Sequence, residues 1–194
     1  MIQKAIRCLD QEDVFKLITK FHDKVLTFIH DPNGNHVIQR SIEVMSEFSK
    51  TAADSGDPDL ASSLSDKMQF IIDDIVANVD ALSTHRYGCR VVQRAIEHCV
   101  DEQKSAVLES IVSSHEMLAK DQYGNYVIQQ VLSCGGQAGQ DAILEMLTKD
   151  GALLTMSKHK YASNVVEAVL VHGMPGVKEK MLEEMLKVSS LNNT

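Results

Sequence analysis

Four segments of this chain are close copies of one another, and their spacing constrains the fold more than any other feature. Each contains Tyr or Asn, Gly or Ala, two variable residues, two branched aliphatic residues and then Gln or Glu. They cover residues 33–39, 87–93, 123–129 and 161–167, so the closing residue recurs at intervals of 54, 36 and 38. A period near 36 residues is typical of a solenoid, in which each repeat buries its apolar face against its neighbours.

The sequence between these segments is helical in pattern. Apolar residues in 70–82 and 107–118 recur at spacings of three and four, which is the period of an amphipathic helix. Each segment also resembles a helix start, because a Gly or Ala and a small polar residue precede a helical run. The sequence therefore predicts an all-α solenoid, and Gln3 stands where a further, partial repeat would close.

The period divides the chain into repeats at 12–48, 67–102, 103–138 and 139–177. Residues 1–11 are expected to be the remnant of a truncated repeat, and 178–194 a C-terminal helix. The longest interval contains residues 49–66, where small, polar and acidic residues accompany Gly56 and Pro58. This composition predicts an exposed, disordered acidic loop inserted between two helices.

Composition narrows the class of protein. The chain has 194 residues, 44% of them hydrophobic, and a net charge of −8. We expect no membrane span, because no apolar run approaches the required length. The four cysteines show no metal-binding or disulfide spacing and predict reduced thiols in a cytoplasmic protein: Cys8, Cys89, Cys99 and Cys134. No cofactor or metal is expected.

The charge is unevenly distributed. Twelve-residue windows beginning at residues 30, 84, 120 and 158 hold seven basic and three acidic residues, whereas the rest of the chain holds 12 and 24. The basic residues are Arg40, Arg86, Arg90, Arg94, Lys120, Lys158 and Lys160. All four tyrosines also lie in these windows. Basic and aromatic residues on one surface indicate single-stranded nucleic-acid binding.

Helical geometry places the variable residues together. The first variable residue and the closing Gln or Glu are at i and i+4, so they lie on one face, and the second variable residue lies about 100° round the helix, towards the adjacent repeat. The two aliphatic residues point into the core. The candidate binding residues are Asn35, His36 and Gln39; Cys89, Arg90 and Gln93; Asn125, Tyr126 and Gln129; and Ser163, Asn164 and Glu167.

These side chains suit unpaired bases. Planar His, Arg and Tyr side chains stack on base faces, while Asn164 offers a weaker surface. An Asn–Gln pair matches the edge of uracil, Gln beside Cys suits adenine, and the acceptor-only Glu167 suits the two donors of guanine. Arg86 and Arg94 are open to two readings, since each could contact phosphate or simply be solvated.

The four segments closely resemble the RNA-binding repeats of Pumilio-type PUF proteins, which read one base per helical repeat. The order of the triplets matches the fourth to seventh of the family's eight repeats. The resemblance implies a right-handed, curved solenoid of three-helix repeats with RNA on its concave face. It also implies a core site 5′-GUAU-3′, bound antiparallel, with guanine read by Ser163, Asn164 and Glu167.

The same resemblance implies a role and partners. PUF proteins regulate messages after transcription, typically by translational repression at 3′ untranslated regions, with deadenylases or other repressors as partners, here on the convex face. The chain lacks the repeat that reads the uracil before guanine, so we expect a piece of a longer array. Uncapped ends predict end-to-end self-association.

Two other classes of protein are alternatives. An armadillo- or HEAT-like scaffold for protein partners is the alternative, although it gives no reason for triplets that vary within a constant framework. An enzyme ranks last, because the sequence shows no nucleophile–base pair, metal cluster or phosphate-binding loop. The sequence therefore favours a non-enzymatic RNA-binding module.

Overall fold

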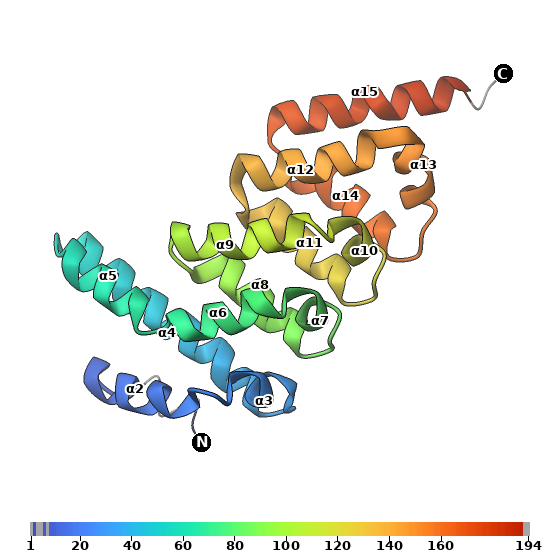
Figure 1. The fold of residues 1–194 in the computed structure, drawn as a ribbon. Helices are drawn as coiled ribbons and strands as arrows, with labels where there is room; N and C mark the ends of the chain where they lie inside the picture. The colour runs from blue at the N-terminus through green and yellow to red at the C-terminus, as the bar shows by residue number, and fades with distance from the viewer. Residues whose placement is uncertain (1, 3–5, 7, 192–194) are drawn as a thin grey trace. The chain divides into compact units, whose positions relative to one another are not determined.

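The computed structural model describes residues 2, 6 and 8–191, and every element in those residues is a helix (Figure 1). This confirms the all-α prediction for the part of the chain that is described. Gln3 lies outside it. The chain divides into two compact units, residues 1–107 and 108–194, and α9 (Asp101–Val112) contains the division.

A three-helix pattern recurs along the chain: a first helix, a short helix and a helix that begins in one of the repeated segments. Unit 1 contains α2 (Gln11–Ile18), η1 (Thr19–Phe21), α3 (Val25–His30), α4 (Gly34–Asp54), α5 (Pro58–Asp66), α6 (Gln69–Ala77), α7 (Val79–Ser83) and α8 (Gly88–His98). After α9 follow α10 (His115–Ala119), α11 (Gly124–Cys134), α12 (Gly136–Thr148), η2 (Lys149–Gly151), α13 (Ala152–Ser157), α14 (Ala162–His172) and α15 (Pro175–Leu191).

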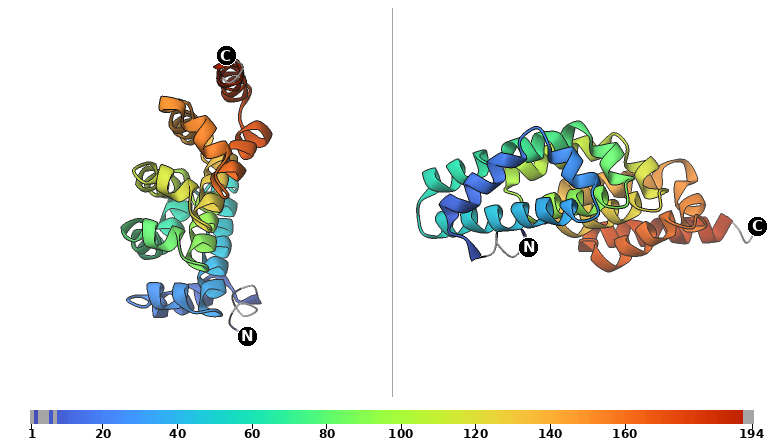
Figure 2. Two further views of the ribbon diagram at one scale, coloured as in Figure 1. Left: turned by 90° about the vertical axis from the view of Figure 1, so that its right-hand side faces the viewer. Right: turned by 90° about the horizontal axis from the view of Figure 1, so that it is seen from below.

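We call α4, α8, α11 and α14 the motif helices. Consecutive motif helices pack on each other within each unit, α4 on α8 and α11 on α14 (Figures 1 and 2). The aliphatic pairs of the repeated segments form the centre of this packing, and none of their eight side chains is more than 6% exposed. The prediction that these pairs point into the core is confirmed, and their burial favours folding by roughly 1.5–3 kcal/mol per side chain.

Residues 49–54 and 58–66 are helical, with a short turn between them, so the prediction of a disordered loop is wrong. The helix α4 continues to Asp54, and α5 begins after Asp57, whose side chain accepts from the Leu60 amide at 2.9 Å. Pro58 occupies the first turn of α5, where its missing N–H costs nothing. The acidic residue and the proline therefore start a helix here.

Packing against α4 holds α5 in place. Leu64 is completely buried and Ala52 is 7% exposed. Ser49 contributes polar contacts: its hydroxyl donates to the Ala61 carbonyl at 2.9 Å and lies 3.0 Å from the Ser65 hydroxyl. Small side chains at these positions let the two helices approach closely. The same small and polar residues, judged by composition alone, had indicated disorder.

The glycine that begins a motif helix allows the backbone of the preceding short helix to approach closely. A Cβ on Gly88 would lie 2.6 Å from the Leu82 carbonyl oxygen, and the same contact is repeated for Gly34 and Gly124 against the preceding short helix. The backbone must shift to admit a methyl group there. The fourth motif helix begins with Ala162, which is completely buried.

We therefore expect Gly88→Ala to lower the free energy of unfolding by about 1–3 kcal/mol, the usual cost of overpacking. Gly176→Ala is the matched control, because no atom lies within 4 Å of its Cβ position and the residue lies in α15. There alanine should stabilise by about 0.5–1 kcal/mol. Urea unfolding of the two variants measures the difference, and equal effects would contradict the close-approach explanation.

The C-terminal helix α15 buries only part of its apolar surface. Val177 and Met181 are 2% and 0% exposed, whereas Leu182 and Leu186 are 51% and 71% exposed. In the described residues, no helix combines the length and the apolar character needed to cross a bilayer.

Candidate nucleic-acid interface

The four motif helices begin in the same register, at Gly34, Gly88, Gly124 and Ala162. Their variable residues therefore occupy the second and third helical positions, as predicted. The second variable residue is exposed in every repeat, whereas the first is buried or half-buried. The candidate surface thus presents one outward side chain and one inward side chain in each repeat.

In two repeats the inward residue is an asparagine, and it holds the closing glutamine of the same repeat by a hydrogen bond. Asn35 is 1% exposed, and its amide nitrogen donates to the carbonyls of Asp31 and Pro32, both at 2.9 Å. Its Oδ1 accepts from Gln39 Nε2 at 2.8 Å. The predicted i,i+4 pair is therefore in contact, and Gln39 keeps its Oε1 and its second amide hydrogen for a ligand.

Asn125 repeats this arrangement in unit 2. It is 1% exposed, donates to the carbonyls of Asp121 and Gln122 at 2.9 and 3.1 Å, and accepts from Gln129 at 2.9 Å. The asparagine amide hydrogens are thus occupied by the chain itself. A uracil edge would therefore mainly meet the glutamine.

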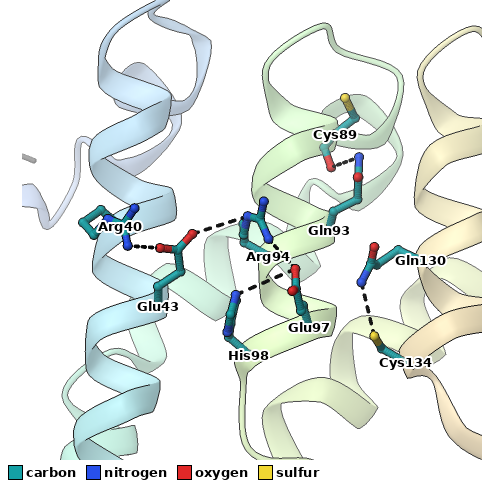
Figure 3. A network of polar contacts seen from close by, with 9 residues as sticks. All are labelled: Arg40, Glu43, Cys89, Gln93, Arg94, Glu97, His98, Gln130 and Cys134. Atoms are coloured by element: carbon teal, nitrogen blue, oxygen red, sulfur yellow. Dashed lines mark hydrogen bonds and ion pairs between the residues drawn. The ribbon is translucent and has the colours of Figure 1, made fainter.

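The second repeat substitutes a thiol. Cys89 is 4% exposed, and its Sγ lies 3.9 Å from the Arg86 carbonyl oxygen. Gln93 donates to the Cys89 backbone carbonyl at 3.0 Å instead of to a side chain (Figure 3). The small thiol leaves the glutamine edge in a different position from that of Gln39 or Gln129.

The fourth repeat differs in charge. Glu167 is exposed, and within the described residues no cation lies at ion-pair distance from its carboxylate. Its neighbour Ser163 is half-buried. Asn164 reaches the adjacent motif helix, where its Nδ2 donates to Asn125 Oδ1 at 3.4 Å, as predicted for the second variable residue. Glu167 is left as an acceptor directed to solvent.

The outward residues are available for stacking. His36, Arg90, Tyr126 and Asn164 are all exposed, and Tyr126 retains 53% of its accessible surface. An aromatic ring this exposed at the start of a buried helix contributes little to the core. Its exposed face can cover a flat apolar ligand.

The arginines near this surface are less free than the sequence indicated. Glu43 of α4 pairs with Arg40 and lies 3.4 Å from Arg94 Nε of α8, and Arg94 also pairs with Glu97 (Figure 3). His98 lies 3.7 Å from Glu97. Arg94 therefore links two motif helices, which favours the structural reading of this residue over phosphate contact.

The expected basic face is correspondingly weaker. Lys120 pairs with Glu116 at 2.7 Å, so three of the seven basic residues have acidic partners outside the counted windows. Arg86 instead lies over the Tyr87 ring at 4.8 Å, and Lys160 lies over the Tyr161 ring at 4.9 Å. These tyrosines directly precede the motif helices α8 and α14.

The sequence reasoning missed the residues that cap the motif helices. Asp31 Oδ1 accepts from the amides of Asn33 and Gly34 at 2.9 and 2.6 Å, and Asp121 Oδ1 accepts from those of Tyr123 and Gly124 at 2.8 Å. Such caps satisfy amides that a helix start leaves unpaired.

Histidines occupy the same position in the other two repeats. His85 Nδ1 accepts from the amides of Tyr87 and Gly88, both at 3.2 Å. His159 Nδ1 accepts from the two equivalent amides at 3.3 Å. We name Asp31, His85, Asp121 and His159 the cap residues. Their constant place, three residues before each helix start, was a signal that the sequence already carried.

The four cysteines differ in how far they are buried. Cys99 is buried, and burial raises the pKa of its thiol to about 12, which keeps it protonated and unreactive. Cys134 is half-buried and lies 3.2 Å from Gln130 Nε2 (Figure 3), whereas Cys8 is exposed. Among the described residues no three His, Cys, Asp or Glu side chains are grouped to hold a metal ion.

The fold and this surface define a helical-repeat protein whose repeats present the same three side-chain positions with different chemistry. The chain belongs to the Pumilio family: the model of the Pumilio-family RNA binding repeat matches residues 24–51, 78–112, 117–148 and 153–186. This is a family of RNA-binding repeats and not of enzymes.

Several known proteins are similar to this chain. The Pumilio domain-containing protein C6G9.14 of Schizosaccharomyces pombe is 32% identical over 187 residues, covering 95% of this chain and 24% of that protein. The suppressor protein MPT5 of Saccharomyces cerevisiae is 35% identical over 111 residues, covering 53% and 11%. The chain thus spans a quarter or less of these relatives.

Solved structures match at the level of the fold. PUF-8 in complex with PBE-RNA superposes with a TM-score of 0.80 at 29% identity, covering 94% of this chain and 48% of that one. The Puf3 RNA-binding domain bound to a Cox17 RNA 3′ UTR recognition sequence gives 0.77 at 34% identity, covering 94% and 49%. The predicted PUF-type solenoid of helical repeats is therefore confirmed.

Proposed function

We propose that this chain binds single-stranded RNA in a sequence-specific manner, one base per repeat, with a core site 5′-GUAU-3′ read antiparallel. The observation that carries the proposal is the common register of the four motif helices. Each presents an exposed second variable residue, and a Gln or Glu one turn after the first variable residue. Stacking and edge recognition of one base need this pair of groups.

The assignment of bases follows the side-chain chemistry. Gln39 and Gln129, each held by an asparagine, suit uracil, and Gln93 beside the small Cys89 suits adenine. Glu167 suits guanine, because its solvent-directed carboxylate accepts from both guanine donors and charge strengthens those bonds. The unpaired state of Glu167 among the described residues supports this most strongly.

The biological role extends the same proposal. Two of the solved relatives are described as bound to PBE-RNA and to a 3′ UTR recognition sequence. We infer that this chain acts on messages in the cytoplasm, at 3′ untranslated regions, where it represses translation. Deadenylases or other repressor proteins would then be its protein partners.

Titration with a labelled RNA tests the proposal against its alternative. Fluorescence anisotropy with an RNA containing 5′-GUAU-3′ should give saturable binding, and single-base substitutions should each weaken it by about 1–3 kcal/mol. Equal binding to all substituted RNAs would contradict sequence-specific recognition. An armadillo- or HEAT-like scaffold would show no saturable RNA binding and would capture a helical peptide.

Removing a stacking ring gives a narrower test. Tyr126→Ala should weaken binding of the cognate RNA by about 1–3 kcal/mol, because an exposed ring is lost while the core is unchanged. Tyr126→Phe is the matched control and should bind nearly as well as the parent. A loss in Phe equal to that in Ala would instead assign the contribution to the hydroxyl group.

A further inference from the structure

The cap residues divide the four repeats into two chemical classes. Asp31 and Asp121 cap the motif helices that carry the uracil-type triplets, whereas His85 and His159 cap those that carry the purine-type triplets. All four accept hydrogen bonds from the same two backbone amides of their repeat. The cap residues therefore keep the same position and the same hydrogen-bonding role in each repeat, while the accepting atom changes from a carboxylate oxygen to an imidazole nitrogen.

The two accepting atoms respond differently to protons. A carboxyl group keeps acceptor capacity whether or not it is protonated, whereas an imidazole nitrogen accepts only while it carries no hydrogen. A histidine cap with both nitrogens protonated must release the two amides that it binds. Histidine is the side chain that changes charge near neutral pH.

The surroundings of His85 keep it neutral. Burial lowers the pKa of His85, and the neighbouring His30 and Arg86 lower it further. The His30 ring lies edge-on at 4.6 Å and the Tyr87 ring at 5.6 Å, measured between centroids. Because the folded pKa is below the unfolded value, the cap is intact above the unfolded pKa and is lost as pH falls through the folded pKa.

The His159 ring also lies beside a tyrosine. Its centroid lies 6.1 Å from that of Tyr161, and the Lys160 ammonium group lies over the Tyr161 ring at 4.9 Å. The amides that it binds belong to Tyr161 and Ala162, directly before Ser163 and Asn164. Likewise, the amides that His85 binds belong to Tyr87 and Gly88, directly before Cys89 and Arg90.

We propose that the cap residues are positioning residues for base recognition, and that the histidine cap at His85 makes discrimination at the adenine position weaken on acidification, whereas the aspartate cap at Asp121 leaves discrimination at its uracil position unchanged. This inference rests on the proposed RNA-binding function. Loss of a cap releases the first helical turn, which carries the two variable residues of the repeat.

The discrimination between bases is the quantity to measure, not affinity alone. Protonated histidines add positive charge and so strengthen binding to every RNA through its phosphates. That gain is the same for two RNAs of equal length, so the ratio of their dissociation constants cancels it. Only a change in how a particular base is held alters the ratio.

The experiment compares three RNAs by anisotropy at constant ionic strength between about pH 8 and about pH 5, the range over which histidine titrates. One RNA is 5′-GUAU-3′ within a fixed flank, and the others replace adenine or the uracil assigned to Asn125, Tyr126 and Gln129. That uracil is the control because its triplet contains no histidine. Discrimination at adenine should fall about fivefold at acidic pH, the factor for one lost cap, while discrimination at this uracil stays constant.

Exchanging the caps supplies the matched variants. His85→Asp should remove the pH dependence at adenine. Asp121→His should create pH dependence at the control uracil. If His85→Asp does not fold, His85→Asn replaces it, because asparagine also caps helices well. Persistence of the pH dependence in the variants would overturn the proposal.

A readout without RNA separates this inference from the proposed function. In NMR spectra of the free protein, the amide resonances of Tyr87 and Gly88 should shift on acidification together with the ring signals of His85. The amides of Tyr123 and Gly124 should not follow them. Absence of RNA binding at every pH with these shifts present would refute the function alone, whereas absence of the shifts would refute the caps.

Discussion

A chain carrying both Ser163→Asn and Glu167→Gln should bind 5′-UUAU-3′ more tightly than 5′-GUAU-3′. The double substitution recreates the pair formed by Asn125 and Gln129, in which the asparagine holds the glutamine at 2.9 Å. The new asparagine has the carbonyls of His159 and Lys160 available, at the places that Asp121 and Gln122 occupy in the third repeat. Competition anisotropy measures the exchange of preference.

The expected change is large because two effects add. The double variant lacks the carboxylate proposed to contact guanine and gains an amide that matches uracil, and each change is expected to contribute about 1–3 kcal/mol. The ratio of the two affinities should therefore shift by roughly 100-fold. Glu183→Gln in α15 is the matched control, since it removes the same charge from an exposed residue elsewhere. An unchanged preference in the double variant would disprove the assignment of bases to triplets.

Leu64→Ala should lower the free energy of unfolding by about 2–5 kcal/mol, the usual cost of emptying a buried leucine site. Leu64 is completely buried where α5 meets α4. Leu60 lies in the same helix but is 39% exposed, so Leu60→Ala should change stability by less than about 0.5 kcal/mol. Guanidinium unfolding followed by circular dichroism measures both.

This pair of variants tests whether residues 49–66 belong to the folded structure. In a disordered loop the two leucines would be equivalent, and both substitutions would be nearly neutral. If Leu64→Ala prevents folding altogether, Leu64→Val removes less volume and should cost about 1 kcal/mol. A neutral result for Leu64→Val as well would contradict the packed helix.

Periodicity predicted the fold well because each helix must bury one apolar face, and this requirement produces the repeating pattern. The aliphatic pairs and the i,i+4 pairs follow from helical geometry alone, so Gln39 contacts Asn35 as expected. The insertion was missed because its buried surface is made by Ser49, Ala52 and Leu64, whose small or isolated side chains leave a weak periodic signal. Composition gives the number of polar residues in a segment, whereas packing depends on which side of the helix those residues occupy.

The site was harder to predict where a side chain binds its own backbone. Asn35 and Asn125 were expected to face a base, but their amide hydrogens are held by carbonyls of the preceding turn. Likewise, the charge count omitted Glu43 and Glu97, which lie just outside the repeated segments and neutralise Arg94. Local hydrogen bonds and ion pairs of this kind depend on three-dimensional contacts that a list of residues does not contain.

The contact between Asn164 and Asn125 has a consequence for how such arrays evolve. The oxygen that orients Gln129 also accepts from the next repeat at 3.4 Å. A substitution at residue 164 therefore alters the partner of the residue that positions the preceding glutamine. Under the proposed reading of bases, selection at one nucleotide of a target would therefore also act on the residue that reads its neighbour, which couples the evolution of these two repeats.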